Sequence, residues 1–392
     1  MTWALNEIEP LSECERVSAI PPIDLTQQFQ TIQADVQTAV MEVLASGRYI
    51  NGQVVDGFSR DFGQYVGTQE CVVCNSGTDA LYLAMRALNI GPGDEVITSP
   101  FTFIATAEMI SAAGATPVFV DIDINTFNLD TAQLEAAITE RTKAIMPVHL
   151  FGQPANLDAV IAIATAHGLT VIEDCAQATG ARWRGQNVGS IGHVGCFSFF
   201  PTKNLGGCGD GGALTTNDPE IAKTTRMLRE HGSYVRYYHE AIGINSRLDA
   251  VQAAILQVKL QHLDAWNQRR AQVAAEYERL LAPIPGVITP TVIDGATPVW
   301  NQYTIRLEGA AEAEEKRNQI RQTLMDNGVI SMVYYPIPLH LQQVFADLGY
   351  RPGSLPAAEQ AARQVLSLPM FPELTSEQQL RVVYGLKEIL AT

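Results

Sequence analysis

SFFPTKNLGGCGDGG, residues 198–212, joins an apolar run to a glycine-rich run and places one lysine, Lys203, between them. The overlapping run HVGCFSFF (193–200) is apolar and aromatic, which is typical of a buried strand. Five glycines within residues 206–212 exclude a helix and predict a loop or tight turn. A lysine at this junction has a fixed stem, is partly removed from water and faces open space, which suits an amine nucleophile. The alternative is a solvated loop lysine, because lysine is rarely buried.

The composition is that of an ordinary folded protein. The chain has 392 residues, of which 46% are apolar and 17% are charged, and its formal net charge is −16. This length is enough for two domains and a large core. The negative charge argues against binding of polymeric nucleic acid, which needs a basic face, but it is compatible with a small anionic ligand.

The sequence also limits location and metal binding. We find no run of about 20 apolar residues, as a membrane helix needs, and residues 1–20 lack the pattern of a secretory signal. We expect residues 1–20 to be a loosely ordered acidic leader. Six cysteines are too few for a disulfide framework in a chain of this length. Cys71 and Cys74 lack the further ligands of a zinc site, so we expect no metal. In the absence of a secretory signal and of a disulfide framework, we expect a cytoplasmic protein.

The first 217 residues alternate between helix and strand patterns. Ile32, Val36, Val40 and Leu44 form one stripe of a helix that ends at Gly47. Apolar strands are then expected at 71–74, 95–98, 116–123, 143–150, 169–174, 193–200 and 211–217, with helices from 78, from 106, over 134–138 and over 156–167. Apolar strands that alternate with helices favour a mostly parallel sheet covered on both faces.

The pattern changes after residue 217. We expect a helix over 218–232, a long helical stretch over 247–282, a strand within 299–309, a helix over 314–328, a strand and proline-rich turn over 329–340, and a terminal helix over 376–390. This order predicts three parts: the leader at 1–20, a large domain at 21–263, and a smaller α+β domain at 264–392, with the long helix as connector.

Polar residues follow three of the expected strands, where open α/β sheets bind ligands. The turn Asn75–Thr78 opens a helix, and its free backbone N–H groups suit a phosphate, although a serine or threonine at such a turn is more often only a helix cap. Asp174 ends a strand and, if buried, needs a partner such as a protonated ring nitrogen or an ordinary ion-pair or cap partner.

Two further residues complete a pattern with Lys203. Gln177 lies close to Asp174 in sequence and could donate to a ring oxygen, and Phe103 could cover the face of a planar ring or belong to the core. A phosphate cradle, a carboxylate for a ring nitrogen, an aromatic face and a lysine amine together describe a site for pyridoxal 5'-phosphate (PLP). The combination is far more specific than any of its members.

The chain resembles the DegT/DnrJ/StrS family of sugar-nucleotide aminotransferases, which are fold-type-I PLP enzymes. The similarity extends from about residue 21 to about residue 375. It rests on the motifs SGTDAL (76–81), GDEVITSPFTF (93–103), GATPVFVDID (114–123), EDCAQATGA (173–181), SFFPTKNLGG (198–207), GINSRLDAVQAA (243–254) and YYPIPLH (334–340).

The resemblance implies a fold and a role for each matching position. It implies an α/β fold with a mostly parallel seven-stranded sheet in the large domain. Lys203 would form a Schiff base with PLP and then move the proton between substrate and cofactor. The expected cofactor-binding residues are Gly77, Thr78 and Ser198 at the phosphate, Asp174 at the pyridinium, Gln177 at the phenolic oxygen, Phe103 over the ring, and Asn245 from the partner subunit.

The resemblance also implies partners. Since Asn245 would come from a second copy, we expect a homodimer with shared active sites. Tyr335 and His340 would face the nucleotide sugar. Residues 237–270 resemble members that act on dTDP-3-keto-6-deoxyhexoses, whereas 367–371 and 151–159 resemble members that act on a UDP-linked 3-keto uronate. We therefore expect transfer of an amino group, with L-glutamate as donor, to a dTDP-3-keto-6-deoxyhexose, with UDP-linked 3-keto uronate or 4-keto sugars as alternatives.

Two other functions stay open at this point. Members that carry a histidine in place of the lysine perform dehydration, and the presence of Lys203 weighs against that reaction. The second is a regulatory or sensory protein that keeps the fold without turnover. Intact Lys203 and Asp174 and the lack of a basic patch weigh against it.

Overall fold

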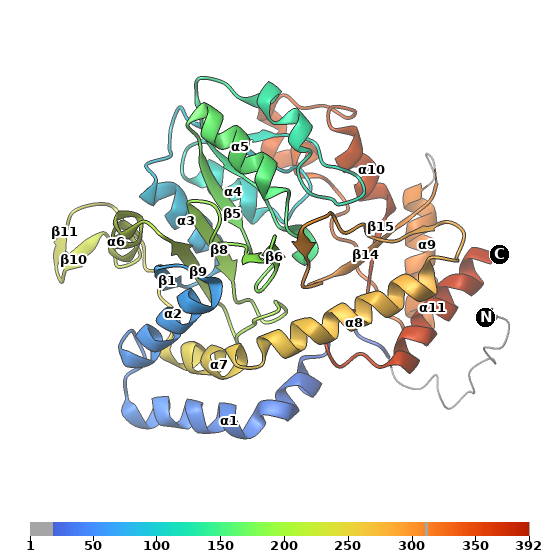
Figure 1. Cartoon of the computed structure of the whole chain (residues 1–392), viewed down its shortest axis with the longest axis horizontal. Helices are drawn as coiled ribbons and strands as arrows, with labels where there is room; N and C mark the ends of the chain where they lie inside the picture. The colour runs from blue at the N-terminus through green and yellow to red at the C-terminus, as the bar shows by residue number, and fades with distance from the viewer. Residues whose placement is uncertain (1–18, 310–312, 392) are drawn as a thin grey trace.

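A seven-stranded sheet forms the centre of the protein in the computed structural model, which describes residues 19–309 and 313–391 (Figure 1). Residues 1–18 of the expected leader lie outside the described part. The sheet order is β1 (Glu70–Cys74), β9 (Gly212–Thr216), β8 (Val194–Ser198), β5 (Thr170–Asp174), β4 (Thr142–Met146), β2 (Glu95–Thr98) and β3 (Thr116–Phe119). β9 is antiparallel to both neighbours, and the other pairs are parallel. The expected mostly parallel sheet is confirmed.

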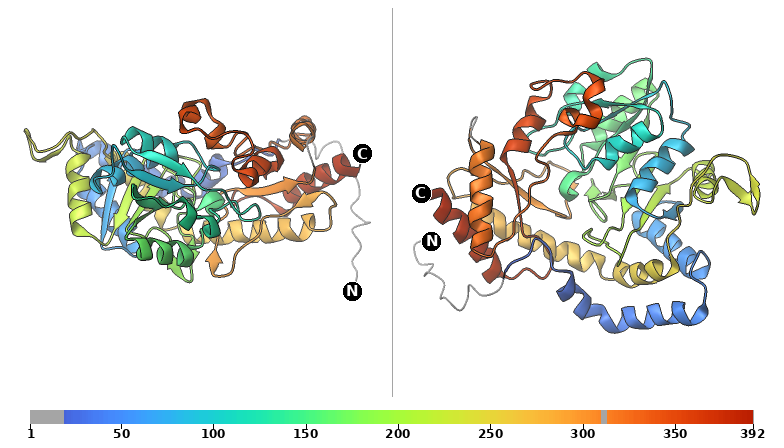
Figure 2. Two further views of the ribbon diagram at one scale, coloured as in Figure 1. Left: turned by 90° about the horizontal axis from the view of Figure 1, so that it is seen from above. Right: turned by 180° about the vertical axis from the view of Figure 1, so that it is seen from behind.

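Helices cover both faces of this sheet. One face carries α3 (Gly77–Ala87), α4 (Ala105–Ala112) and α6 (Pro219–Leu228), and the other carries α2 (Gln53–Val66), α5 (Leu157–His167) and α7 (Ala250–Leu260). Successive strand residues supply the two cores in turn: Val171 packs on the α5 side and Ile172 on the α3 side. Burial on both faces explains why the strands are apolar throughout rather than alternating. Outside α7 lies α1 (Leu25–Ser46), which ends at Gly47 as expected (Figure 2).

A second, antiparallel sheet lies in the C-terminal part. It joins β12 (Val287–Ile288), β14 (Tyr303–Leu307) and β15 (Val365–Leu368), and its core is shared with α8 (Leu263–Leu281), α9 (Ala313–Asp326) and α11 (Ser376–Ala391). Helix α10 (Pro356–Gln364) precedes β15. The domain boundary near Asp264 stays a prediction, and it falls at the start of α8.

Three expected elements differ from the structure. The long helix over 247–282 is two helices, because α7 packs against the large sheet while α8 continues to the C-terminal core. Residues 131–137 form two short 3-10 turns instead of a helix. The strand expected within 329–340 is reduced to isolated bridges at Val329 and Met332, since the prolines that follow cannot donate to a ladder.

Helix α2 was not expected from the sequence. Its glycines at 57 and 63 lower the helix propensity, yet Val55, Phe58, Phe62 and Val66 form a buried stripe at helical spacing. That stripe was the available signal. The stripe packs on β1 and α7, so tertiary contacts stabilise a helix that the local propensity disfavours.

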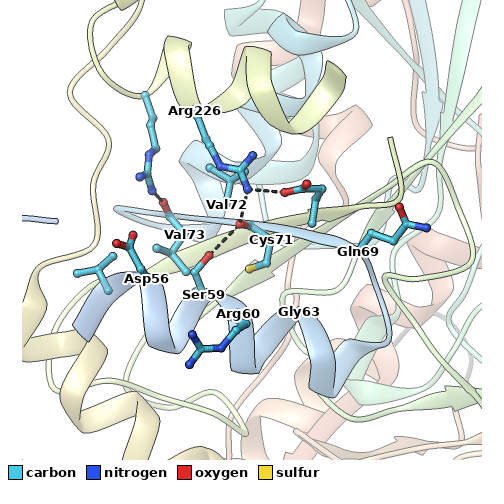
Figure 3. A pocket seen from close by; sticks show the side chains of 12 residues that line it. Asp56, Ser59, Arg60, Gly63, Gln69, Cys71, Val72, Val73 and Arg226 are labelled. Carbon is cyan, nitrogen blue, oxygen red and sulfur yellow. Dashed lines mark hydrogen bonds and ion pairs between the residues drawn. The ribbon is translucent and has the colours of Figure 1, made fainter. Parts of the chain in front are cut away.

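The outer edge of β1 is closed by side chains (Figure 3). Ser59 Oγ donates to the carbonyl of Cys71 at 2.8 Å, and the guanidinium of Arg226 lies against the same carbonyl at 3.5 Å. The guanidinium of Arg229 donates to the carbonyl of Val73. These donors occupy carbonyls that an open edge strand would otherwise present to another chain.

One element projects from the body of the protein. The hairpin of β10 (Ser233–Val235) and β11 (Tyr238–His239) extends beyond α6 at the left of Figure 1. Its apolar and aromatic side chains are exposed, among them Tyr237 at 77% and Tyr238 at 72%. Separately, within residues 19–309 and 313–391 we find no helix that is long and apolar enough to span a membrane.

Candidate active site

The sheet order brings the expected site residues to one edge. β1, β8 and β5 run in the same direction, because β9 between β1 and β8 is antiparallel to both. Their carboxyl ends therefore meet at the same edge, where Ser198 and Asp174 end their strands and Asn75–Thr78 follow β1. This is the edge at which open α/β sheets bind ligands.

A cradle for an anion forms where α3 begins. Ser76 caps this helix by accepting a hydrogen bond from the N–H of Asp79 at 3.0 Å, so the helix starts with its N–H groups directed at the end of β8. Gly77 lies against Ser198: a Cβ atom at Gly77 would come within 2.7 Å of the Cβ atom of Ser198. Any larger residue would fill the space beside the Ser198 hydroxyl. Thr78 follows in the first turn and is half-buried.

Asp174 is buried, with 4% of its surface exposed, and each of its oxygens accepts one hydrogen bond. Thr106 Oγ1 donates to Oδ2 at 2.8 Å, and the N–H of Ala176 donates to Oδ1 at 3.1 Å. Burial raises the pKa of Asp174, while these two hydrogen bonds and the positive charge of Lys203 act in the opposite direction. The carboxylate can still accept from a cationic partner, because each oxygen has a second lone pair.

Lys203 lies in the loop after β8, partly buried. Burial lowers the pKa of its amine to about 8, and the negative charge of Asp174 opposes that shift. A large fraction of the amine is therefore neutral at mildly alkaline pH, which an amine needs in order to act as a nucleophile or a base. The structure thus brings Lys203 into electrostatic contact with Asp174, its expected neighbour.

Gln177 and Tyr335 are directly bonded to each other. Gln177 Nε2 donates to the Tyr335 hydroxyl at 3.2 Å, and Gln177 Oε1 accepts from the N–H of Phe151 at 2.7 Å. The first contact links the loop after β5 to the proline-rich segment of the C-terminal part. Burial raises the pKa of the Tyr335 phenol, so this group is a neutral hydrogen-bonding partner near neutral pH.

Phe103 is an exposed aromatic ring. It has 56% of its surface exposed, whereas its neighbour Phe101 is fully buried. The possibility that Phe103 belongs to the core is therefore wrong. The centroid of its ring lies 6.4 Å from that of the Tyr335 ring. An exposed apolar ring at this position is available to cover a planar ligand.

Two further expected residues have other partners in the structure. His340 is buried, its Nε2 lies 3.1 Å from Glu359, and its ring packs beside Tyr350. Its other ring nitrogen, Nδ1, is buried and has no hydrogen-bond partner among the described residues. Asn245 is exposed on this chain and forms an isolated bridge with Glu230. Both roles stay predictions.

The sequence interpretation missed two polar residues of the site. Thr106 was expected as the start of a helix, and the structure shows that its hydroxyl holds Asp174, which is 68 residues away. Asn204 follows Lys203 and is 4% exposed, with its amide bonded to Asn267, Asn301 and the carbonyl of Val299. Thr106 lies in the loop-to-helix region after β2, so knowledge of the strand order would have placed it near Asp174.

The residues present fit PLP. The helix N-terminus with the Ser198 hydroxyl suits a phosphate, and the gap left by Gly77 gives it room. The buried Asp174 carboxylate suits a protonated ring nitrogen, and the Lys203 amine has the lowered pKa that a covalent link to an aldehyde requires. Three groups of the described residues thus match three parts of one cofactor: its phosphate, its ring nitrogen and its aldehyde.

Known proteins are similar to this chain in sequence over most of its length. Residues 30–387 match the DegT/DnrJ/EryC1/StrS aminotransferase family. A pleiotropic regulatory protein of Geobacillus stearothermophilus is 51% identical over 94% of this chain and 98% of its own length. A dTDP-3-amino-3,4,6-trideoxy-alpha-D-glucose transaminase of Streptomyces venezuelae is 47% identical over 94% of this chain and 96% of its own. A UDP-N-acetyl-3-dehydro-alpha-D-glucosamine 3-aminotransferase of Acidithiobacillus ferrooxidans is 46% identical over 95% and 98%.

A solved structure agrees in three dimensions. The crystal structure of DesV from S. venezuelae in complex with a ketimine intermediate superimposes with a TM-score of 0.92 at 46% sequence identity. The match covers 96% of this chain and 100% of that one. The fold is therefore shared over 96% of this chain.

Proposed function

The chain belongs to the DegT/DnrJ/EryC1/StrS aminotransferase family, and on that premise we propose that it transfers an amino group from L-glutamate to a dTDP-linked 3-keto-6-deoxyhexose. Membership of the family makes the protein a PLP-dependent sugar aminotransferase, which acts on a nucleotide sugar with an amino donor. The choice of dTDP, of the 3-keto position and of glutamate is the proposed part. The observation that carries the aminotransferase chemistry is the buried Asp174, whose charge acts on the amine of Lys203, and the choice of a dTDP-linked 3-keto sugar is supported by the name of the S. venezuelae relative.

PLP supplies an electron sink that lets an amino group leave one carbon and join another. The described residues would do the rest of the work. The N-terminus of α3, with Gly77 and Thr78, and the hydroxyl of Ser198 would hold the phosphate. Asp174 would balance the positive charge of the ring nitrogen, because a buried carboxylate favours the protonated ring.

Lys203 would move the proton. Its Nζ atom, neutral in a large fraction of molecules at mildly alkaline pH because burial lowers the pKa to about 8, would accept a proton from the donor's α-carbon and return it at the cofactor. Gln177 would contact the ring oxygen, and the exposed ring of Phe103 would cover one face and exclude water. Tyr335, bonded to Gln177, and His340 would contact the sugar.

The names of the relatives support a 3-amino sugar as product, but they do not decide between dTDP and UDP as the nucleotide that carries the sugar. The transaminase from S. venezuelae carries a dTDP-sugar in its name, and the aminotransferase from A. ferrooxidans carries a UDP-sugar. A UDP-linked 3-keto uronate or a 4-keto sugar is therefore the alternative substrate. The regulatory protein from G. stearothermophilus favours a second candidate, a regulatory role without turnover. The Lys203–Asp174 pair weighs against that candidate, because a purely regulatory protein has no need of a reactive buried amine.

The first experiment tests the chemistry. The protein with PLP is incubated with glutamate, and the spectrum should change as the cofactor takes up the amino group. Lys203→Ala should lose both this change and turnover, while Lys143→Ala, at an exposed position of β4, should keep both. Full activity of Lys203→Ala would exclude the assigned role. A panel of dTDP- and UDP-linked 3-keto and 4-keto sugars then identifies the acceptor.

We also propose a homodimer with shared sites. The exposed Asn245 and the exposed aromatic hairpin of β10 and β11 support it, since a partner can reach both. Mixing inactive Lys203→Ala with weakened Asn245→Ala tests the proposal. If sites are shared, mixed dimers contain one site with both native residues and recover activity. No recovery after subunit exchange would rule out sharing. A cytoplasmic location is part of the proposal and is supported by five free cysteines among the described residues.

A further inference from the structure

The loop that carries Lys203 is held by side chains at alternating positions. Asn301 Nδ2 donates to the carbonyl of Thr202 at 3.4 Å, and the amide of Asn204 bonds to three groups. On the other side, Lys259 Nζ donates to the carbonyl of Gly206 at 2.6 Å, and Gln252 Oε1 accepts from the N–H of Cys208 at 2.8 Å. The pinned positions are 202, 204, 206 and 208, and Lys203 lies between the first two.

Asn204 uses both hydrogens of its amide nitrogen. Nδ2 donates to Asn267 Oδ1 at 2.7 Å and to the carbonyl of Val299 at 2.9 Å, while Oδ1 accepts from Asn301 Nδ2 at 2.9 Å. Asn204 and Asn301 are 4% and 6% exposed, so water does not compete freely for these bonds. The residue next to Lys203 in sequence is thus held by three buried side-chain hydrogen bonds.

Hydrogen bonds link the partners of Asn204 to Gln177, another residue of the candidate site. The N–H of Val299 donates to the carbonyl of Gly152 at 2.9 Å, and the N–H of Phe151 donates to Gln177 at 2.7 Å. Gly152 leaves no room for a side chain, because a Cβ atom there would come within 2.9 Å of the backbone nitrogen of Asn301. A continuous bonded path therefore connects Gln177 to Asn204 through 151–152 and 299–301.

We infer that Asn204 and Asn301 are positioning residues that hold Lys203 Nζ at the place where it reacts. This inference rests on the proposed role of Lys203. A long lysine stem has many rotamers, and a proton moves efficiently only when the amine is within hydrogen-bond reach of the reacting carbon. Pinning the backbone on both sides of residue 203 reduces the number of positions that Nζ can visit. The 299–301 segment belongs to the C-terminal part, so that part helps to place the lysine.

Amide hydrogen exchange on the full chain, with and without added PLP, tests directly whether Asn204 and Asn301 hold the loop around Lys203. The N–H of Lys203 is bonded to the carbonyl of Phe200, and that of Gly207 to the carbonyl of Phe199, so both report on the loop. We expect Asn204→Ala to speed exchange at these two amides by about tenfold or more, since three buried hydrogen bonds are lost. Asn301→Ala should act in the same direction. The control is Gln379→Ala, which removes a buried amide bonded to the carbonyl of Val273 in the C-terminal core.

A second readout concerns the lysine itself. In the protein loaded with PLP, the pH at which the lysine–cofactor absorbance changes should shift in Asn204→Ala and Asn301→Ala and stay in place in Gln379→Ala. A merely structural role would lower the melting temperature of all three variants without this difference. If Asn204→Ala does not fold, Asn301→Ala carries the test. Unchanged exchange at Lys203 and Gly207 together with an unchanged titration in the folded variants would overturn the inference.

The test separates this inference from the proposed function. Hydrogen exchange depends on the loop and not on the chemistry of Lys203, so it can succeed even if Lys203→Ala keeps its activity. That outcome would confirm that Asn204 and Asn301 hold the loop and would exclude the proposed role of the Lys203 amine. Conversely, an inactive Lys203→Ala with unchanged loop exchange in the asparagine variants would keep the function and exclude the positioning role.

Discussion

Two neighbouring carboxylates at the end of β5 show how a structural anion differs from one available for chemistry. Glu173 is fully buried, and its oxygens accept from His149 Nε2 at 2.9 Å and from the N–H groups of Gly189, Ile191 and Gly192 at 2.8, 3.0 and 2.6 Å. Asp174 points to the other side of the strand and accepts two hydrogen bonds. Both groups are buried, so burial alone does not distinguish them.

The difference is the number of free acceptor positions. His149 Nδ1 accepts from the N–H of Ala155 at 3.0 Å, so its Nε2 carries the hydrogen that Glu173 accepts. With four donors, the Glu173 carboxylate is saturated and fixes the turn at 189–192 to the strand. A ring nitrogen of His149, a carboxylate oxygen of Glu173 and the sulfur of Cys175 lie within 4.8 Å of one another, yet these hydrogen bonds already account for the arrangement. Asp174 keeps acceptor positions open on the side of Lys203.

The largest expected effect comes from Asp174→Asn. This variant removes the negative charge and keeps the shape, so the fold should be retained while the charge that we propose for the cofactor ring is lost. We expect turnover to fall by about 150- to 5,000-fold, which corresponds to the roughly 3–5 kcal/mol of a broken buried ion pair. Steady-state kinetics and a thermal melt measure the two effects. Near-native turnover would show that Asp174 is a second structural carboxylate.

Glu173→Gln should show the opposite pattern, with a loss of stability and little loss of turnover. Replacing one oxygen by an amide group places N–H against N–H, so we expect the free energy of unfolding to fall by about 2–4 kcal/mol. The folded fraction should retain turnover within a few fold, because this side chain faces away from the Lys203 side. Urea denaturation and kinetics at low temperature check this. A stable but inactive variant would contradict the comparison.

Thr106→Val tests whether Asp174 depends on its few donors. The change is close in shape and removes one of two hydrogen bonds to the carboxylate, so the pKa of Asp174 should rise further. We expect about a three- to tenfold loss of turnover, in line with about 1 kcal/mol for a hydrogen bond. The matched control is Thr225→Val, a fully buried threonine that donates to the carbonyl of Ile221 in α6. Equal losses in both variants would remove the special role of Thr106.

The smallest effect concerns the titration of Lys203. In protein without cofactor, reaction of this amine with an amine-specific reagent should rise with pH and reach half its limit near the pKa of about 8, because the neutral form reacts. The charge of Asp174 raises this pKa, so Asp174→Asn should lower it, by less than about one unit. Glu173→Gln should leave it in place. Peptide mapping assigns the rate to Lys203. A shift in Glu173→Gln and none in Asp174→Asn would reverse the comparison.

The sequence by itself determined the local elements and the type of site. Apolar strands that alternate with helices indicated the mostly parallel sheet, and the run of glycines after Lys203 indicated a loop, because hydrophobic period and glycine content act over a few residues. The family motifs pointed to PLP and to an aminotransferase. Helix α2 was not predicted, because its glycines lower the local helix propensity. Its apolar stripe packs on β1, and this tertiary contact stabilises the helix.

Only the tertiary structure decided which polar groups meet. Thr106 reaches Asp174 across 68 residues, and Asn301 reaches Asn204 across 97. These pairs depend on the order of strands in the sheet and on how the C-terminal part packs against it, and no local pattern encodes either. The same holds for the two carboxylates of β5. The adjacent letters E and D are equivalent in sequence, and the number of donors that the fold brings to each one separates them.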